Sequence, residues 1–415
     1  MNMMQPEATR SLQNSELTFK YNQDHGRHGW LRLTPAYSVK LVNDILKTSG
    51  LGIAVLDPFS GTGTTPLSAA YADDVGTGVE LNPFLMWLAK AKVAQYGPET
   101  LRDARQLIDG ISALISAGEV TPVEHPPIHN IERWWDVPEM SFLCTLKAAI
   151  DEVTSRYTQC ESLLLVAFCR TLIKLSNAAF NHQSMSFRER DTSQALLFSE
   201  KPDFFGIFRA EMAFVIESAA DNPPGEAEIL AGDSRYISSL VSRKYDLLIT
   251  SPPYPNRISY IRELRPYMYW LGYLKNGREA GELDWSAIGG TWGIATSRLA
   301  EWERPHNGFW PAYLTVILDG IAASDNKSGA LLSNYVGKYF YDMWCHLQGI
   351  ADVVADGGEV HYVVGNSTFY QVLVPVEILF RDMLQETGFK NARVTKIRKR
   401  NSKKELYEYD VSARR

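Results

Sequence analysis

The chain has 415 residues, of which 45% are hydrophobic and 22% charged, and its formal net charge is -6 at pH 7. This composition is typical of a globular protein with either one large domain carrying insertions or two domains. A negative overall charge does not indicate a nucleic-acid-binding protein, so only local basic clusters bear on that question. The first twenty residues lack the apolar core of a signal peptide, and Arg170 and Lys174 interrupt the longest apolar stretch. We therefore expect a cytoplasmic protein with no membrane partner.

Strands and helices are expected to alternate in the first 96 residues. A helix is predicted over 35–47, with Thr34 as its cap and Pro35 at its first position. A short apolar run then ends at Asp57-Pro58 and predicts a strand. The following elements are a helix, a strand and a helix, at 64–71, 75–80 and 84–95. This alternation predicts an α/β fold, in which a parallel sheet has helices on both faces.

Two segments interrupt the alternation. Residues 97–225 have an irregular helical pattern and are predicted to be a helical insertion, and the aromatic and glycine-rich residues 260–329 are predicted to be a second one. The catalytic core would then comprise the remaining segments, 1–96, 226–259 and 330–415. Within it we expect strands at 227–231, 245–250 and 359–364, helices at 334–355 and 372–386, and a closing antiparallel hairpin at 393–397 and 406–411.

A glycine-rich corner follows the first predicted strand, with the sequence Asp57-Pro58-Phe59-Ser60-Gly61-Thr62-Gly63-Thr64-Thr65. Gly61 and Gly63 lack side chains, so a ligand can approach the backbone closely at the edge of the sheet. Pro66 stands where a dinucleotide-binding fingerprint needs its third glycine, and no Gly-Lys-Ser/Thr follows, so neither that fingerprint nor a phosphate-binding P-loop is present. Taken alone, the corner could also be a plain tight turn.

Acidic residues end three successive predicted strands. Besides Asp57, Glu80 ends the second strand, where its carboxylate can accept hydrogen bonds from both ribose hydroxyls of a nucleoside. Asp233 ends the third strand, where a carboxylate could take an adenine amino group. Each residue alone could be a helix cap. The three together favour S-adenosylmethionine as the cofactor, and the four cysteines have no metal-binding spacing, so no metal is expected.

Ser251-Pro252-Pro253-Tyr254 follows the strand predicted over 245–250. The prolines stiffen the backbone and remove two donors, so the local carbonyl groups face outward as acceptors. An exocyclic amine is a poor nucleophile because its lone pair is conjugated with the base. If the Ser251 hydroxyl and the Pro252 carbonyl accept its two hydrogens, that lone pair is directed toward a methyl donor, while Tyr254 offers a face on which a flipped-out base can stack. An ordinary Pro-Pro turn is the alternative, and the buried strand before it disfavours that interpretation.

As a set, these motifs resemble the amino-group DNA methyltransferases of the N4-cytosine and N6-adenine type. The resemblance implies a Rossmann-like class I methyltransferase sheet, mostly parallel with an antiparallel closing hairpin, and double-stranded DNA as the substrate. Leu33-Thr34-Pro35 resembles the family element that touches the methionine part of the cofactor. The implied catalytic residues are Ser251, Pro252, Pro253 and Tyr254. The implied cofactor-binding residues are Thr34, Pro35, Asp57, Phe59, Gly61, Thr62, Gly63, Thr64, Glu80 and Asp233.

The residues after Tyr254 are where we expect base readout. The candidates for nucleic-acid contact are Arg257, Arg262, Arg265, Trp292 and Arg298. For Arg257 and Arg262, ion pairing within the protein is an equally good explanation. A second basic cluster, at 396–404, is most simply a solvated face.

Within the family that the chain resembles, a serine-led tetrapeptide accompanies cytosine more often than adenine. N4-cytosine methylation is therefore the leading hypothesis, and N6-adenine methylation is the runner-up. RNA base methylation and a non-catalytic DNA-binding or cofactor-binding subunit are the remaining alternatives. Methylation at carbon 5 of cytosine is excluded because no cysteine follows a proline. A cognate restriction endonuclease or a defence-system protein would be the expected partner.

Overall fold

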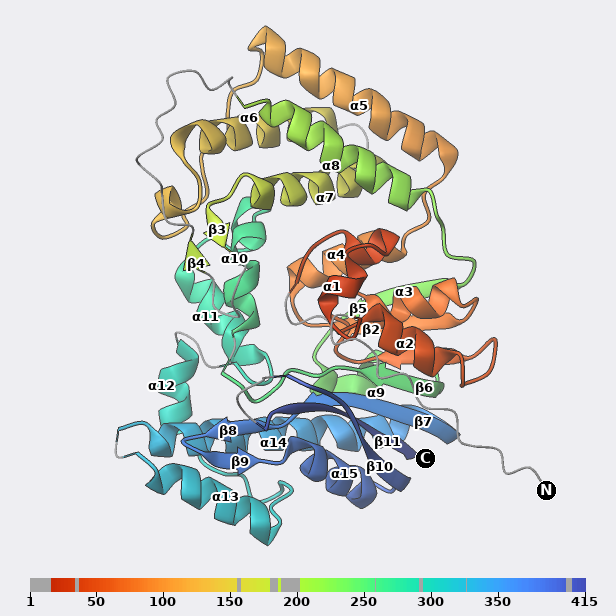
Figure 1. Ribbon diagram of the computed structural model, residues 1–415, viewed down its shortest axis with the longest axis vertical. Helices are drawn as coiled ribbons and strands as arrows, with labels where there is room; N and C mark the ends of the chain where they lie inside the picture. The colour runs from red at the N-terminus through yellow and green to blue at the C-terminus, as the bar shows by residue number, and fades with distance from the viewer. Residues whose placement is uncertain are drawn as a thin grey trace, which may run out of the picture.

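The computed structural model describes residues 16–33, 37–154, 158–179, 186–187, 202–257, 259–290, 294–325, 327–400 and 405–415. Thr34, Pro35 and Trp292 lie outside these ranges. A seven-stranded sheet crosses the molecule in the order β10-β11-β7-β6-β1-β2-β5 (Figure 1). Its strands are β1 Ala54–Asp57, β2 Val75–Glu80, β5 Glu226–Ala231, β6 Tyr245–Thr250, β7 Val354–Gly365, β10 Lys390–Lys399 and β11 Tyr407–Arg414.

The sheet is parallel except at one strand. β1 pairs in parallel with β2 and β6, β2 with β5, and β6 with β7. β11 is antiparallel to both β7 and β10, because it returns from β10 through a hairpin and inserts between the two. The predicted α/β fold is therefore confirmed, with its mostly parallel sheet and antiparallel closing hairpin.

Alternating side chains on the strands give the sheet two apolar faces. Val55 points toward one face, where it packs with residues of α2 Val39–Leu46 and α3 Thr64–Tyr71. Leu56, the next residue, belongs to the opposite core with residues of α14 Gly329–Val353 and α15 Val376–Glu386. Helices thus cover both faces, as the strand–helix alternation predicts.

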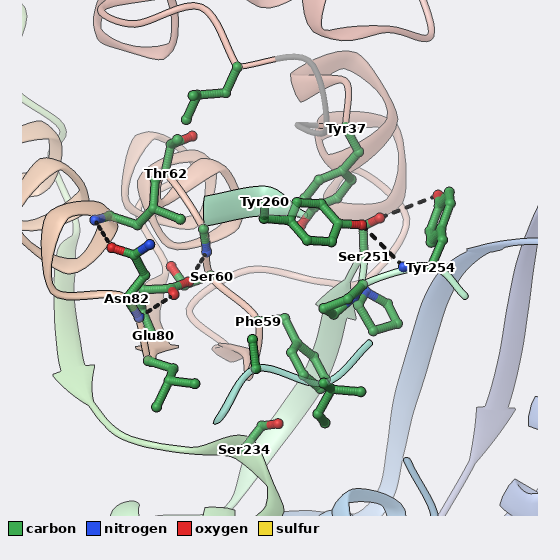
Figure 2. Close-up of a pocket in the computed structure, with 18 of the residues that line it drawn as sticks. Tyr37, Phe59, Ser60, Thr62, Glu80, Asn82, Ser234, Ser251, Tyr254 and Tyr260 are labelled. Atoms are coloured by element: carbon green, nitrogen blue, oxygen red, sulfur yellow. Dashed lines mark hydrogen bonds between the residues drawn. The ribbon is translucent and has the colours of Figure 1, made fainter. Parts of the chain in front are cut away.

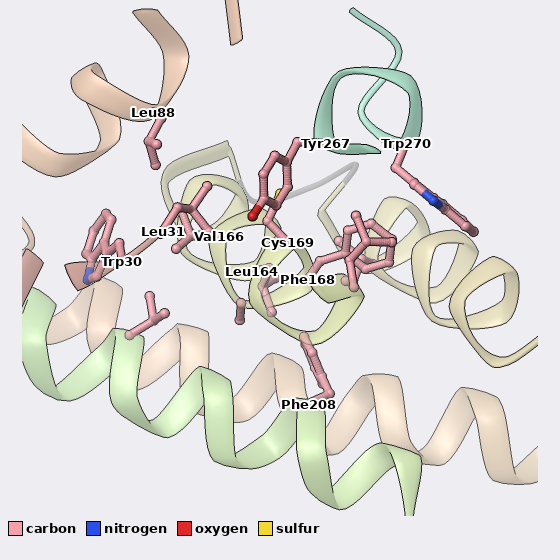
Figure 3. Packing of buried hydrophobic residues seen from close by; sticks show 14 of the residues in the cluster. Trp30, Leu31, Leu88, Leu164, Val166, Phe168, Cys169, Phe208, Tyr267 and Trp270 are labelled. Carbon is pink, nitrogen blue, oxygen red and sulfur yellow. The ribbon is translucent and has the colours of Figure 1, made fainter. Parts of the chain in front are cut away.

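The predicted helical insertion, residues 97–225, forms a layer of helices beside the sheet (Figure 1). Its long helices are α5 Pro98–Ala117, α6 Val137–Thr154, α7 Thr158–Lys174 and α8 Phe204–Ala219. Between them lie the short elements η2 Ile131–Arg133, β3 Ala178–Ala179 and β4 Ser186–Phe187. A large apolar core joins this layer to α4 Pro83–Val93 of the sheet domain, and Figure 3 shows side chains of α4, α7 and α8 meeting there.

The second predicted insertion, residues 260–329, divides between two cores. Its helices are α10 Tyr260–Trp270, α11 Gly277–Ser286, α12 Ile294–Glu301 and α13 Ala312–Ala323. Trp270 of α10 packs edge-on, at 5.7 Å between ring centroids, against both Trp135 and Phe168 of the helical layer (Figure 3). Leu314 and Leu318 of α13 instead belong to the core around α14. The segment therefore spans from the helical layer to the far face of the sheet.

An N-terminal strap, residues 16–33, ties the helical layer to the sheet domain. It contains α1 Phe19–Asn22 and η1 Gly26–Gly29. The fully buried guanidinium of Arg27 donates to the carbonyl oxygens of Lys92, Ala94 and Ala219 and to Oδ1 of Asn222, at 2.5–2.9 Å. These acceptors lie at and after the end of α4 and α8, so one side chain joins both elements.

Three helices begin at least a full turn away from the predicted residue. The helix expected over 334–355 begins earlier, as α14 Gly329–Val353, and Val354 already belongs to β7. The helix expected over 35–47 begins only at Val39, because Ser38 is extended and caps it by accepting a hydrogen bond from the Lys40 amide at 3.2 Å. The helix expected over 372–386 begins at Val376, and the residues before Pro375 form β9 Val372–Val374, which pairs with β8 Ser367–Phe369. Proline disfavours helical geometry in the residue before it, which explains that boundary. In the described ranges no helix combines the length and apolarity needed to cross a bilayer.

Candidate active site

The carboxyl ends of β1, β2, β5 and β6 surround a cavity of about 380 Å³. Ligands of open α/β sheets bind at the carboxyl ends of the strands, at the point where the strand order changes direction. In this sheet that point is at β1, which has β2 and β5 on one side and β6 and β7 on the other. Ten of the predicted site residues line the cavity: Phe59, Gly61, Thr62, Thr64, Glu80, Asp233, Ser251, Pro252, Pro253 and Tyr254. Figure 2 shows Thr62 and Glu80 on one side and Ser251 and Tyr254 on the other, with Phe59 between them.

The glycine corner turns the chain from β1 into α3. Gly61 and Gly63 have φ angles of 52° and 78°, in the left-handed region that favours glycine. A Cβ on Gly63 would lie only 3.0 Å from the Cβ of Ala89 in α4, so this residue also permits close helix packing. Gly61 lines the cavity, whereas Gly63 supports the corner from behind.

Glu80 holds the corner in place at the end of β2. One carboxylate oxygen accepts a hydrogen bond from the Gly61 amide at 2.7 Å, and the other accepts one from the Asn82 amide at 2.8 Å. Burial raises the pKa of Glu80 to about 7, against the lowering effect of these amides. A carboxylate offers about four acceptor positions, so Glu80 can still accept hydrogen bonds from a ligand in the cavity.

Asp57 is fully buried behind the cavity and does not line it. Its carboxylate accepts hydrogen bonds from the Thr250 hydroxyl at 2.6 Å, the Phe59 amide at 3.1 Å and the Tyr37 hydroxyl at 3.1 Å. Burial raises the pKa of Asp57 to about 6 despite these donors. In the structure, this residue joins the ends of β1 and β6, which carry the two predicted motifs.

Asp233 lines the cavity but is also part of an ion pair. Its carboxylate accepts from Nε and Nη2 of Arg235 at 3.0 and 2.5 Å, and Arg235 is held in turn by Asp342 of α14 at 3.0 Å. The residue also caps η3 Ser234–Tyr236, which leads into α9 Ile237–Leu240. Arg235 was not predicted as a site residue. Its position two residues after Asp233 is the feature of the sequence that could have indicated this ion pair.

The loop 251–254 is held rigidly at the end of β6. The Tyr254 amide donates to the hydroxyl oxygen of Tyr260 at 3.1 Å, and the Tyr339 hydroxyl donates to the Pro253 carbonyl at 2.9 Å. The Pro252 carbonyl accepts no hydrogen bond from the part of the chain that is described. This leaves an acceptor at the cavity wall.

The closing hairpin completes the wall around Tyr254. The Tyr254 hydroxyl donates to Oε1 of Glu408 at 3.1 Å, and the Arg400 guanidinium lies over the Tyr254 ring, 5.2 Å from its centroid. Arg398 holds Glu408 through Nε–Oε2 and Nη2–Oε1 contacts of 2.6 and 3.1 Å. These contacts were not predicted from the sequence. They form because β11, which follows the loop by more than a hundred residues, lies beside β7 in the sheet.

The four predicted nucleic-acid contacts that the structure describes, all of them arginines, do not line the cavity. Arg257 and Arg262 are exposed beyond it, and Arg265 is half-buried, which lowers its pKa. Arg298 forms a bidentate ion pair with Glu282 at 2.8 and 3.0 Å, which the sequence did not predict. Among the described residues, no cluster of acidic, histidine or cysteine side chains could hold a metal ion.

The strand order, the glycine corner and the cavity at the carboxyl edge are the features expected of an S-adenosylmethionine-dependent methyltransferase. Over an alignment 456 positions long, the chain is 23% identical to the type II methyltransferase M.BsoBI of Geobacillus stearothermophilus, covering 97% of this chain and 87% of that protein. It is 22% identical to M.AvaI of Nostoc sp., covering 91% and 82%. These matches confirm the predicted resemblance to amino-group DNA methyltransferases, the enzymatic activity and the methyl donor.

Two other comparisons add little. No protein-family profile matches the chain. Among solved structures, TrmN from Thermus thermophilus aligns with a TM-score of 0.30 and 10% identity, covering 96% of this chain and 52% of that one. The rRNA methyltransferase aviRa from Streptomyces viridochromogenes aligns at 0.31 and 9%, covering 97% and 93%. TM-scores this low bear on neither fold nor function.

Proposed function

We propose that the protein transfers a methyl group from S-adenosylmethionine to N4 of a cytosine that is flipped out of double-stranded DNA. The observation that carries this proposal is the placement of Ser251 and Tyr254 across one cavity from Glu80 and the glycine corner. The type II names of the two relatives support DNA as the substrate.

The proposed cofactor position lies along the glycine corner. The cavity volume of about 380 Å³ falls in the range of small-molecule sites. Glu80 would accept hydrogen bonds from the ribose hydroxyls, and Asp233 would use an acceptor position not taken by Arg235 for the adenine amino group. Phe59, Thr62 and Thr64 would contact the rest of the cofactor. Asp57 and Gly63, which do not line the cavity, would act indirectly. Asp57 would fix the ends of β1 and β6, and Gly63 would allow the turn of the glycine corner.

The proposed base position lies at the loop 251–254. Bound S-adenosylmethionine supplies a methyl group on a positively charged sulfur, which keeps the electron pair of the broken C–S bond. Ser251 Oγ and the Pro252 carbonyl would accept the two amine hydrogens and so turn the nitrogen lone pair toward that methyl group. The nitrogen then forms the C–N bond and releases one proton to solvent. Most of the catalysis would be positioning and electrostatics rather than strong base action.

Tyr254 would form the stacking face for the target base. A base stacked on an aromatic side chain gains about 1–3 kcal/mol. The hydrogen bond to Glu408 and the guanidinium of Arg400 hold the tyrosine ring before the base arrives, which reduces the ordering needed on binding. Pro253, fixed by Tyr339, would keep the loop at its place on the cavity wall.

Residues 260–329 are proposed to contact the DNA around the target base. Arg262, and Arg257 just before the segment, are the best candidates, since both are exposed and follow the loop 251–254 closely in the sequence. Arg265 and Arg298 are weaker ones, because the first is half-buried and the second is paired with Glu282. Residues 97–225 would mainly support α10.

Nucleoside mass spectrometry tests the proposal directly. The purified protein is incubated with isotopically labelled S-adenosylmethionine and either sequence-diverse DNA or total RNA, and a Ser251→Ala variant serves as the control. Labelled N4-methylcytosine, absent with the variant, is the expected result. Labelled N6-methyladenine would overturn the choice of base and keep the mechanism, because the same two acceptors can serve an adenine amine. Label found only in RNA, or in neither nucleic acid, would overturn the proposal.

A further inference from the structure

Three side chains form a chain of hydrogen bonds beside the proposed base position. Ser251 Oγ lies 3.4 Å from the Tyr254 hydroxyl oxygen, and that hydroxyl lies 3.1 Å from Oε1 of Glu408. Nε of Arg398 donates a hydrogen bond to Oε2 of Glu408 at 2.6 Å. All four residues line the cavity, although Glu408 and Tyr254 are 154 positions apart in the sequence.

The direction of these hydrogen bonds follows from their last member. A carboxylate has no proton to donate, so the bond between Glu408 and Tyr254 must use the tyrosine hydrogen. Burial raises the pKa of Tyr254 well above its ordinary value, so this hydroxyl keeps its hydrogen at neutral pH. With its hydrogen committed to Glu408, the tyrosine oxygen is left as an acceptor, and the Ser251 hydroxyl can donate to it.

We propose that Glu408 is a positioning residue that sets the polarity of Ser251 through Tyr254. The inference rests on the proposed function, in which Ser251 must accept a hydrogen from the target amine. A serine hydroxyl has one hydrogen and two lone pairs, and it could equally turn its hydrogen toward the amine nitrogen, which would block the lone pair needed for methyl transfer. Glu408 draws the serine hydrogen away from the cavity and leaves the serine lone pairs for the substrate.

The contact between Ser251 and Tyr254 is long and has room to shorten. A separation of 3.4 Å between two hydroxyl oxygens exceeds the usual 2.7–2.8 Å. Catalytic hydrogen bonds are often long before the substrate binds, and hydrogen bonds in a chain strengthen one another in a low-dielectric site. A base stacked on the Tyr254 ring would exclude water from this contact and so strengthen it.

A purely structural role for Glu408 makes a different prediction. In that case the carboxylate would only prop the Tyr254 ring for stacking, and its loss would weaken DNA binding. The polarity role instead predicts loss of turnover with DNA binding preserved. Glu408→Gln separates the two, because glutamine has nearly the same size but can donate a hydrogen to the tyrosine oxygen and reverse the direction of the chain.

The experiment compares Glu408→Gln, Tyr254→Phe and the double variant with the unmodified protein. Steady-state kinetics would give kcat and the KM for DNA, calorimetry the affinity for S-adenosylmethionine, and thermal melting the integrity of the fold. We expect Glu408→Gln to lower kcat about 10–100-fold with KM and cofactor affinity within about twofold. The double variant should be no slower than Tyr254→Phe, because phenylalanine already breaks the chain.

Glu405→Gln is the matched control, since Glu405 lies on the same hairpin and is exposed, and its carboxylate contacts Lys399 and Tyr407 at the surface. It should keep full activity. Full activity of Glu408→Gln, a raised KM with unchanged kcat, or additive losses in the double variant would overturn the inference. An unmodified protein that methylates no base would instead refute the proposed function, so the two failures can be told apart.

Discussion

Cofactor binding should depend on pH through Glu80. Burial raises the pKa of this carboxyl to about 7, so we expect it to be ionised in about 9% of molecules at pH 6 and about 91% at pH 8. If only the ionised form accepts the ribose hydroxyls, the affinity for S-adenosylmethionine should rise about tenfold between these pH values, equivalent to about 1.4 kcal/mol. Binding therefore tightens as the pH rises through the pKa of the folded protein.

Isothermal titration calorimetry at several pH values between 6 and 8 measures this dependence. Glu80→Gln is the control, because the glutamine amide does not titrate. Dividing the affinity of the unmodified protein by that of the variant removes any effect of the titration of S-adenosylmethionine itself. The variant should bind weakly and nearly independently of pH. A smaller residual slope near pH 6 is expected from Asp57, whose pKa is about 6. An affinity ratio that stays constant from pH 6 to pH 8 would refute the assignment of Glu80 to the cofactor.

Three further predictions concern the loop, the strap and the corner. Tyr254→Ala should lower turnover at least about 100-fold while cofactor affinity, measured by calorimetry, stays nearly unchanged; a fully active variant would contradict the catalytic assignment. Arg27→Met should cost about 3–5 kcal/mol in urea denaturation, because two buried and two part-buried acceptors lose their donor. Arg298→Met should cost under about 1 kcal/mol, because its ion pair is half-exposed. Equal costs would refute this ranking. Gly63→Ala should cost about 1–3 kcal/mol in the same assay, whereas alanine at the unobstructed helical Gly110 should not destabilise the fold.

The central elements of the sheet could be predicted from the sequence almost residue by residue. β2 and β6 are short apolar runs bounded by turn residues, and α3 starts directly after the glycine corner, so local patterns determine their ends. The prediction of a helix over 372–386 was wrong for its first residues, and the sequence contains the reason. Pro375 divides an apolar run whose first three residues pair with β8.

The candidate site could be predicted only in part, since half of it comes from segments distant in the sequence. Strand-end residues such as Glu80 and Ser251 are found by their position after an apolar run, and they do line the cavity. Glu408 and Arg400 reach Tyr254 only because β11 inserts between β7 and β10. Strand order is a property of the whole sheet, and no local pattern around Glu408 indicates which loop it will face.

The divided packing of residues 260–329 limits how this enzyme can be re-engineered. α10 contributes Trp270 to the core of the helical layer, while α13 contributes Leu314 to the core beneath the sheet. A replacement cassette taken from a relative would therefore have to match two unrelated apolar surfaces at once. Swapping such a segment alone should cost stability before it alters the choice of DNA site. Exchanges that carry residues 97–225 along with the segment would preserve the helical-layer contacts. If residues 260–329 contact the DNA as proposed, such exchanges are the more tractable route to a changed recognition sequence.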